Sequence, residues 1–169
     1  AVVLPIGFRD LRLTDSQRLT PRQRVALYQH ISDHAESIGL GIVDAVEIDR
    51  RNILQAALAS MAMAVANLSP QPDYLLIDGK FTIASPTAQR AIIKGDSRSI
   101  SIAAASIVAK VTRDRMMASY DLQYPQYGFA RHKGYGTAFH LEMLKTHGAT
   151  PHHRSSFAPV RTVLVDTAR

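Results

Sequence analysis

The chain has 169 residues, of which 46% are hydrophobic and 20% charged, enough to bury one core, so we expect a single domain over residues 1–169. It contains no cysteine, which excludes disulfides and thiolate metal sites, and no apolar run approaches the roughly eighteen residues of a membrane helix. The net charge of +6 is uneven: residues 1–79 carry 7 arginines against 9 acidic residues, a net of −2, whereas residues 80–161 carry 12 basic against 4 acidic residues, a net of +8.

This charge distribution has two interpretations. A basic half suits an anionic partner such as nucleic acid, but an ordinary enzyme with a solvated basic surface has the same composition.

The sequence also lacks the basic and apolar regions of a signal peptide. We therefore expect a cytoplasmic protein without a membrane segment.

The first half of the chain alternates between strand and helix patterns. The apolar run 1–4 predicts a β-strand, and Thr20-Pro21-Arg22-Gln23 forms a capping box that predicts a helix ending at Gly39. The run 40–46 predicts another strand. Beyond it, apolar residues spaced by four, three, four and three predict a second core helix: Leu54, Leu58, Met61, Val65 and Leu68.

Two short strands and a long helix are predicted next. Residues 74–77 are an apolar run that predicts a buried strand, and 90–94 predict a second strand. The long helix follows from about Ser99 and ends near Tyr124-Pro125.

The last part of the chain begins with a loop at 127–137 that is rich in glycine, tyrosine and basic residues. A short helix is predicted at 138–147, with a stop at Gly148, and the tail 151–159 is expected to be extended. Strands mixed with helices at this spacing indicate an α/β sheet with helices packed on it.

Two acidic residues stand where apolar ones are expected. Asp78 ends the strand at 74–77, and Asp114 lies about 20° from Ile107 within the apolar stripe of the long helix. A buried, unpaired carboxylate costs several kcal/mol, so each acid must meet a cation, a proton or several donors. Carboxylates at the ends of strands and on helices suit Mg²⁺ or Mn²⁺, and together the pair indicates a metal site.

Each acid taken alone has a structural alternative. Asp78-Gly79 is a common turn dipeptide, and Asp114 could be satisfied by Arg113, by Arg115 or by a backbone donor. Both alternatives stay open at this point.

Residues that suit phosphate and base contacts gather near these acids. The basic ones are Lys94, Arg98, Lys110, Arg113, Arg115, Arg131 and Lys133. Tyr135 lies between two glycines, which is a poor position for packing and a good one for stacking on a sugar or base, although a core or hinge role is the alternative. For the adjacent pair His152-His153 we favour a phosphate or solvent role over metal binding.

A series of strings from Leu13 to Val160 then resembles one known family: LTDSQRLTP, EIDRRNILQA, YLLIDG, IIKGDSRSISIAAASIVAKVTRDRMM, YPQYGFARHKGYGT and HHRSSFAPV. In this order they resemble ribonuclease HII, the type 2 ribonuclease H, in its bacterial form. The resemblance implies an α/β, ribonuclease H-like fold, a mixed β-sheet flanked by helices, with a C-terminal helix and tail over about 137–169.

The resemblance also implies an activity. The family is expected to cut the RNA strand of RNA–DNA hybrids, including single ribonucleotides embedded in duplex DNA, as a monomer. The implied reaction is a two-metal-ion hydrolysis with Mn²⁺ or Mg²⁺ that leaves a 5′-phosphate and a 3′-hydroxyl.

Site residues follow by position. Asp78 and Asp114 match two of the family's four metal-binding, catalytic carboxylates. Tyr135 matches the tyrosine that senses the ribonucleotide through its 2′-hydroxyl, and Lys133 is expected to bind nucleic acid nearby. Ser16 and Asn52 are also expected to bind nucleic acid, near its phosphates.

The sequence departs from the family pattern in two places. Gln17 and Arg18 replace a usual lysine pair, and the chain begins after the first strand of the family, whose Asp-Glu-Ala-Gly-Arg-Gly motif supplies the other two carboxylates. We therefore expect this chain by itself to be inactive or very weak. The alternative function is a non-catalytic nucleic-acid binding module in which the acids are structural.

Overall fold

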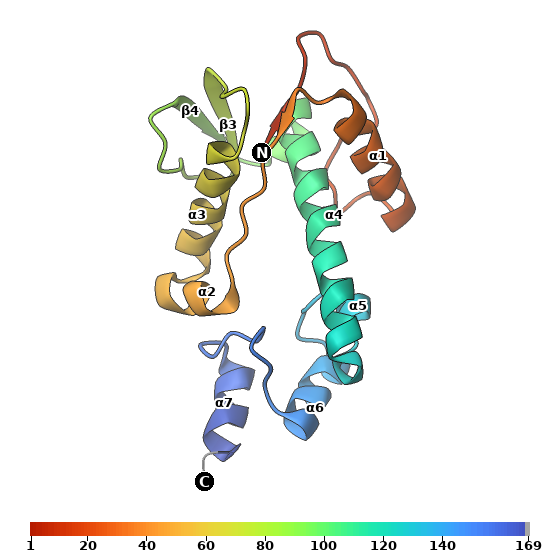
Figure 1. The fold of residues 1–169 in the computed structure, drawn as a ribbon, viewed down its shortest axis with the longest axis vertical. Helices are drawn as coiled ribbons and strands as arrows, with labels where there is room; N and C mark the ends of the chain where they lie inside the picture. The colour runs from red at the N-terminus through yellow and green to blue at the C-terminus, as the bar shows by residue number, and fades with distance from the viewer. Residues whose placement is uncertain (168–169) are drawn as a thin grey trace. The chain divides into compact units, whose positions relative to one another are not determined.

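A computed structural model describes residues 1–167, with side chains to residue 165. The chain divides into two compact units, and Figure 1 labels the helices and strands that make them up. Unit 1 comprises Ala1–Ile42 and Ala57–Val111, and unit 2 comprises Val43–Ala56 and Thr112–Arg169. The helices α3 (Ile53–Ala66) and α4 (Ile100–Gln123) each contribute residues to both units.

Unit 1 begins with a short antiparallel pair around a helix. Strand β1 (Val2–Val3) pairs with β2 (Ser37–Ile38), and α1 (Pro21–His34) lies between them in sequence. The predicted capping box is confirmed, since Thr20 accepts the Gln23 N–H and the Gln23 side chain accepts the Thr20 N–H. The predicted end at Gly39 is wrong, because the backbone becomes extended after His34 to form β2.

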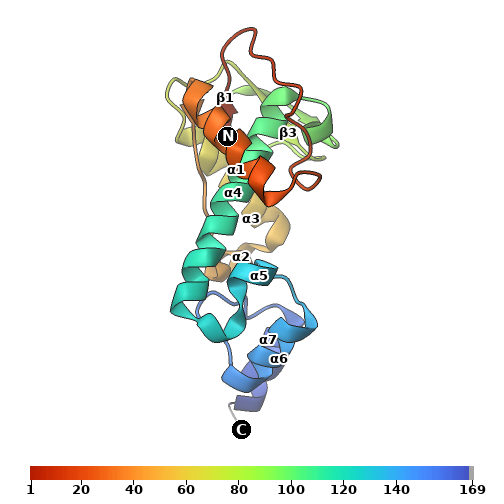
Figure 2. The ribbon, with the colours of Figure 1, turned by 90° about the vertical axis from the view of Figure 1, so that its right-hand side faces the viewer.

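The main core of unit 1 lies between α1 and the first half of α4, which Figures 1 and 2 both draw side by side. Both alanines and branched side chains of α4 face this core. The fully buried members of this core include Leu27, Ile31, Ala103, Ala104, Ile107, Val108 and Val111.

A parallel pair completes unit 1. Strand β3 (Tyr74–Asp78) runs beside β4 (Ala88–Ile92), and the 3₁₀ turn η1 (Gly95–Ser97) leads into α4. The apolar side chains of Leu75 and Ile77 pack with residues of α3 in a second core. The predicted α/β class and both strands are confirmed, the second strand lying two residues earlier than expected.

The predicted strand at 40–46 is wrong. A Cβ at Gly39 would collide with the carbonyl oxygen of Ala64, and one at Gly41 with that of Ser60, so this segment lies directly against the backbone of α3. Asp44 then caps α2 (Ala45–Arg51) by accepting the Glu47 N–H at 2.8 Å. Gly39 still pairs with Ala1, through backbone hydrogen bonds of 2.8 and 3.0 Å, and the residues that follow it form a packing strip rather than a strand.

Unit 2 is helical. It holds α2, the second half of α4, the turn η2 (Pro125–Tyr127), and three further helices: α5 (Phe129–His132), α6 (Ala138–His147) and α7 (Ala158–Thr167). Helix α6 contacts η2 and α7. The predicted ends of the long helix and the bounds of α6 are confirmed.

The extended tail predicted at 151–159 is wrong. Residues 151–157 form turns, and α7 begins at Ala158 with Val160 buried against unit 2. The carboxylate of Asp49 on α2 binds this region, accepting the backbone N–H and hydroxyl of Ser155 and the hydroxyl of Ser156. Within residues 1–167, no helix is both long and apolar enough to cross a membrane.

Candidate functional site

Asp78 ends β3 with its side chain on the exposed face of the strand. The strand alternates, so Leu75 and Ile77 point inward while Leu76 and Asp78 point outward. The expectation of a buried Asp78 is therefore wrong: the run 74–77 is half-buried rather than buried on both faces. An exposed carboxylate at a strand end is accessible to a cation or a substrate.

The carboxylate of Asp78 is held by a backbone donor. Its Oδ1 accepts the N–H of Gly95 at 2.8 Å. A Cβ at Gly95 would lie 3.2 Å from that oxygen and 2.5 Å from Cδ1 of Ile102. Glycine at this position therefore lets the main chain approach the acid. Asp78 is a strand residue and not a turn residue, since the N–H of Gly79, which has a φ of +112°, still donates to the carbonyl of Ile92 at 3.0 Å.

Asp114 lies on α4 in unit 2 and is half-buried. The fully buried stripe of α4 ends at Val111 and resumes at Met117, which leaves Asp114 between two apolar sections of the helix. The expectation that Asp114 is fully buried is therefore wrong, because its side chain is partly accessible to solvent. Since Asp78 belongs to unit 1, the convergence of the two acids on one metal site stays a prediction.

The donor set fits a hard cation. Among residues 1–167, no cluster of three or more histidines and acids is placed to hold a metal ion. Mg²⁺ commonly binds proteins through one or two carboxylates and completes its shell with water and substrate phosphate, so each aspartate is a chemically suitable ligand for such an ion.

Tyr135 presents its ring from a fixed turn in unit 2. Its side chain is 69% exposed, which confirms that the ring is not packed in the core. Its N–H donates to the carbonyl of His132 at 2.9 Å, and its own carbonyl accepts the N–H of Thr137 at 2.9 Å. Gly134, with a φ of +83°, lies inside this turn. The backbone is ordered while the aromatic face stays open, as a stacking residue requires.

Two cations lie beside this turn. Lys133 is half-buried and adopts a φ of +54° at the end of α5. Its carbonyl accepts a hydrogen bond from Nη2 of Arg113 at 3.5 Å, and a Cβ at Gly134 would lie 3.5 Å from the same nitrogen. The structure thus brings together Arg113, Lys133 and Tyr135, which combine positive charge with an exposed ring.

Comparison with known proteins places this arrangement in a family, because residues 5–160 match the family described as Ribonuclease HII. The chain belongs to the ribonuclease HII family. It is similar to the Ribonuclease HII of Geobacillus kaustophilus (strain HTA426), at 55% identity over 164 residues that cover 97% of this chain and 63% of that protein. It is also 54% identical over 161 residues to the Ribonuclease HII of Geobacter sulfurreducens, covering 95% of this chain and 74% of that protein.

The fold agrees with this family. The crystal structure of the ribonuclease H2 from Pyrococcus horikoshii OT3 matches with a TM-score of 0.75 at 23% identity, over 92% of this chain and 81% of that one. The predicted ribonuclease H-like fold is therefore confirmed. The chain spans 63% of the length of the Geobacillus kaustophilus relative.

The two residues that the ribonuclease HII resemblance assigned to phosphate contacts have structural partners. Ser16 is buried, with its hydroxyl 2.9 Å from that of Ser106. Asn52 has a φ of +78° between α2 and α3, and its side chain accepts the N–H of Gln55 at 3.0 Å. Asn52 is exposed and accessible to a phosphate, whereas Ser16 is buried.

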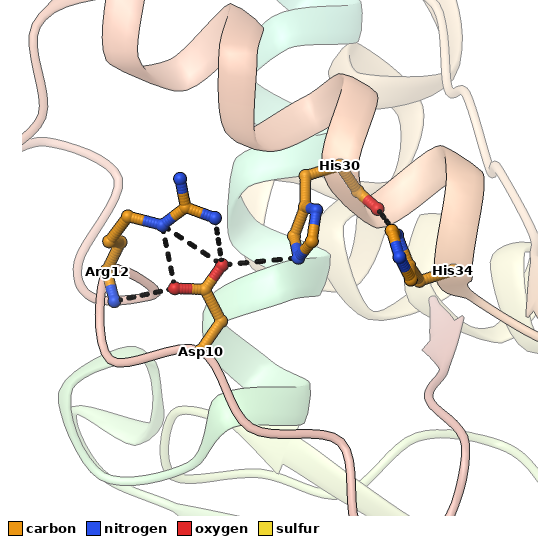
Figure 3. Close-up of polar contacts among 4 residues, drawn as sticks. All are labelled: Asp10, Arg12, His30 and His34. Atoms are coloured by element: carbon orange, nitrogen blue, oxygen red, sulfur yellow. Dashed lines mark hydrogen bonds and ion pairs between the residues drawn. The ribbon is translucent and has the colours of Figure 1, made fainter.

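Sequence reasoning missed a buried acid in unit 1, which Figure 3 shows. Asp10 is 9% exposed and accepts hydrogen bonds from the backbone N–H, Nε and Nη2 of Arg12, while Nε2 of His30 lies 3.3 Å away. The hydrogen bonds from Arg12 hold the pKa of Asp10 below its usual value. The Asp10-Leu11-Arg12 spacing gave only a weak signal for this ion pair.

Sequence reasoning also missed the contacts that the histidines of unit 2 make inside the unit. His132, His140 and His153 form hydrogen bonds inside the unit, and His152 stacks on Tyr120 with ring centroids 3.8 Å apart. The expected phosphate or solvent role is therefore wrong for His153, which is committed to internal partners.

Proposed function

We propose that this ribonuclease HII chain acts on RNA–DNA hybrids and on single ribonucleotides embedded in duplex DNA, with the very weak activity that the sequence leads us to expect of the chain by itself. The reaction is hydrolysis of the phosphodiester to a 5′-phosphate and a 3′-hydroxyl. The observation that carries the proposal is the family match over residues 5–160, which includes Asp78, Asp114 and Tyr135.

Substrate recognition is assigned to the turn around Tyr135. An exposed ring on an ordered backbone can stack on a sugar or base, and the 2′-hydroxyl is the group that distinguishes RNA from DNA. Arg113 and Lys133 lie at the same turn and would neutralise phosphates of the bound strand.

Metal binding is assigned to Asp78 and Asp114, with Mn²⁺ or Mg²⁺ as the ion. Bound divalent ions supply a water of lowered pKa and stabilise the leaving oxygen. The protein's own contribution is orientation, since the Gly95 N–H fixes one oxygen of Asp78 and leaves the carboxylate on an exposed strand end.

The proposal is tested on a labelled duplex that carries one ribonucleotide. With excess protein and Mn²⁺, Asp78→Asn and Asp114→Asn should each reduce the cutting rate about 100-fold or more, because a neutral amide is a poor ligand for a hard cation. The dissociation constant for the duplex, measured by fluorescence anisotropy, should change by no more than about threefold. Asp73→Asn, at an exposed acid just before β3, is the matched control and should retain the wild-type rate.

Two results would contradict the proposed nuclease function. Equal cutting by the wild type and by both aspartate variants would remove the acids from the reaction. Binding of the duplex by the wild type without any metal-dependent product, with affinity kept or raised in Asp114→Asn, would instead support the non-catalytic binding module.

A further inference from the structure

A line of hydrogen bonds in unit 2 ends on the backbone of Tyr135. The N–H of Thr150 lies 2.9 Å from Nδ1 of His153, Nε2 of His153 lies 3.0 Å from Nε2 of His140, and Nδ1 of His140 lies 2.9 Å from the carbonyl oxygen of Tyr135. We call Thr150, His153 and His140 the histidine relay.

The chemistry of the two ends fixes every proton in the histidine relay. A carbonyl oxygen only accepts, so Nδ1 of His140 carries hydrogen and its Nε2 is an acceptor. A backbone N–H only donates, so Nδ1 of His153 is an acceptor and its Nε2 carries the hydrogen that His140 accepts. Both rings are therefore neutral, and each is in a single tautomer.

A third histidine holds the same turn from the other side. His132 donates from Nε2 to the carbonyl of Tyr127 at 2.7 Å and accepts the N–H of Gly134 on Nδ1 at 3.2 Å. Its ring stacks on that of His140, with centroids 4.3 Å apart and planes at 15°. Two consecutive residues, Gly134 through its N–H and Tyr135 through its carbonyl, thus form hydrogen bonds with a stacked pair of imidazoles.

The surroundings favour the neutral forms of His140 and His153. His132 and His140 are each 7% exposed and pack with the buried rings of Tyr127 and Phe129. Burial lowers the pKa of His140 below its usual value and lowers that of His153 to about 4.

We propose that His140 is a positioning residue for ribonucleotide recognition, because it holds the carbonyl of Tyr135 and so sets where the exposed tyrosine ring stands. His153 acts one step further away by fixing the tautomer of His140. The inference rests on the proposed role of Tyr135 in recognising the substrate.

The test compares variants that keep or lose single hydrogen bonds. His140→Asn places an amide N–H near the position of Nδ1 and keeps the donor to Tyr135, whereas His140→Leu loses it. His153→Gln likewise keeps a donor near Nε2, whereas His153→Leu does not. His147→Asn changes an exposed histidine on the same helix and is the matched control.

The first readout is discrimination, the ratio of dissociation constants for an all-DNA duplex and for the same duplex with one ribonucleotide, measured with Ca²⁺. His140→Leu should lower this ratio about tenfold, toward the value of Tyr135→Ala, with little change in affinity for all-DNA duplex. His140→Asn should restore most of the ratio, and His153→Leu should have a smaller effect than His140→Leu. Far-UV circular dichroism identifies the folded variants.

The second readout needs no nucleic acid. In protein labelled with 3-fluorotyrosine, the ¹⁹F resonance of Tyr135 should shift or broaden in His140→Leu and return in His140→Asn. A folded His140→Leu protein with wild-type discrimination and an unchanged Tyr135 resonance would overturn the inference. If the wild type bound both duplexes equally while the Tyr135 resonance still depended on His140, the role of Tyr135 in ribonucleotide recognition would be overturned. The positioning of Tyr135 by His140 would remain supported.

Discussion

At the level of single residues, the contact between Gly95 and Asp78 links packing to chemistry. The same glycine donates its N–H to the carboxylate and touches the side chain of Ile102, which is 4% exposed in the core of unit 1. A change at Gly95 therefore acts on the acid and on the core together. Ile102 is the neighbour that can yield, because the atom in the way is the far end of its side chain.

Gly95→Ala should destabilise the protein by about 1–3 kcal/mol, because the new methyl group would overpack against Cδ1 of Ile102. Ile102→Val removes that atom and should by itself cost about 0.5–1.5 kcal/mol. In the double variant the two costs should partly cancel, as urea unfolding can measure. Strict additivity of the two changes would contradict the contact.

Of the single-residue features, the sequence predicts the exposure of Tyr135 but not that of Asp78. The exposure of Tyr135 could be predicted because flanking glycines leave a ring without packing partners. The exposure of Asp78 could not, because Tyr74-Leu-Leu-Ile resembles a strand buried on both faces, whereas Leu76 is 40% exposed. The link from His140 to His153 joins residues 13 apart whose side chains meet only in the folded unit.

At the level of elements, the strip at residues 39–42 depends on two glycines. The backbone of α3 lies where a Cβ of Gly41 would be, and a main-chain atom cannot move aside as a side-chain end can. The strip and α3 therefore pack backbone to backbone, which a strand of larger residues could not do.

Gly41→Ala should destabilise the protein by about 3 kcal/mol or more, since α3 must shift to admit the methyl group. The measurement is the urea midpoint. Gly136→Ala is the matched control: its nearest contact would be 3.8 Å, from Phe157, so the midpoint should stay near the wild-type value. An unchanged midpoint for Gly41→Ala would show that the strip is not packed as described.

Helices with side-chain caps could be predicted and the rest of the chain less so. Thr20 and Thr137 each accept an N–H in the first turn of their helices, a local signal that the sequence displays. The strip at 39–42 has a strand-like composition, but its backbone pairing ends at Gly39, which bonds to Ala1. Helix α7 was missed because the run from Pro151 to Pro159 was predicted to be extended, although proline near the start of a helix removes no hydrogen bond.

At the level of the whole molecule, the buried histidines make stability depend on pH. The pKa of His153 is about 4 in the folded chain, against an ordinary value of about 6.5. The unfolded chain therefore binds more protons in this window, and the stabilisation, complete above pH 6.5, is lost as the pH falls toward 4. A fully buried ring would account for about 3 kcal/mol, and solvent screening of this half-buried one reduces the loss to about 2 kcal/mol.

The difference between the wild type and His153→Gln isolates this effect, because every other ionisable side chain is present in both proteins. The free energy of unfolding of the wild type should decrease relative to that of the variant between pH 6.5 and 4, measured by urea unfolding at several pH values. Parallel curves would mean that His153 is protonated as readily in the folded chain as in the unfolded one.

The turn that carries Tyr135 has a thermodynamic consequence for any ligand. Since its amide and carbonyl are both bonded before a duplex arrives, contact with the ring freezes few additional torsions. A preorganised aromatic platform loses little conformational entropy on association, so more of the stacking energy is retained as affinity.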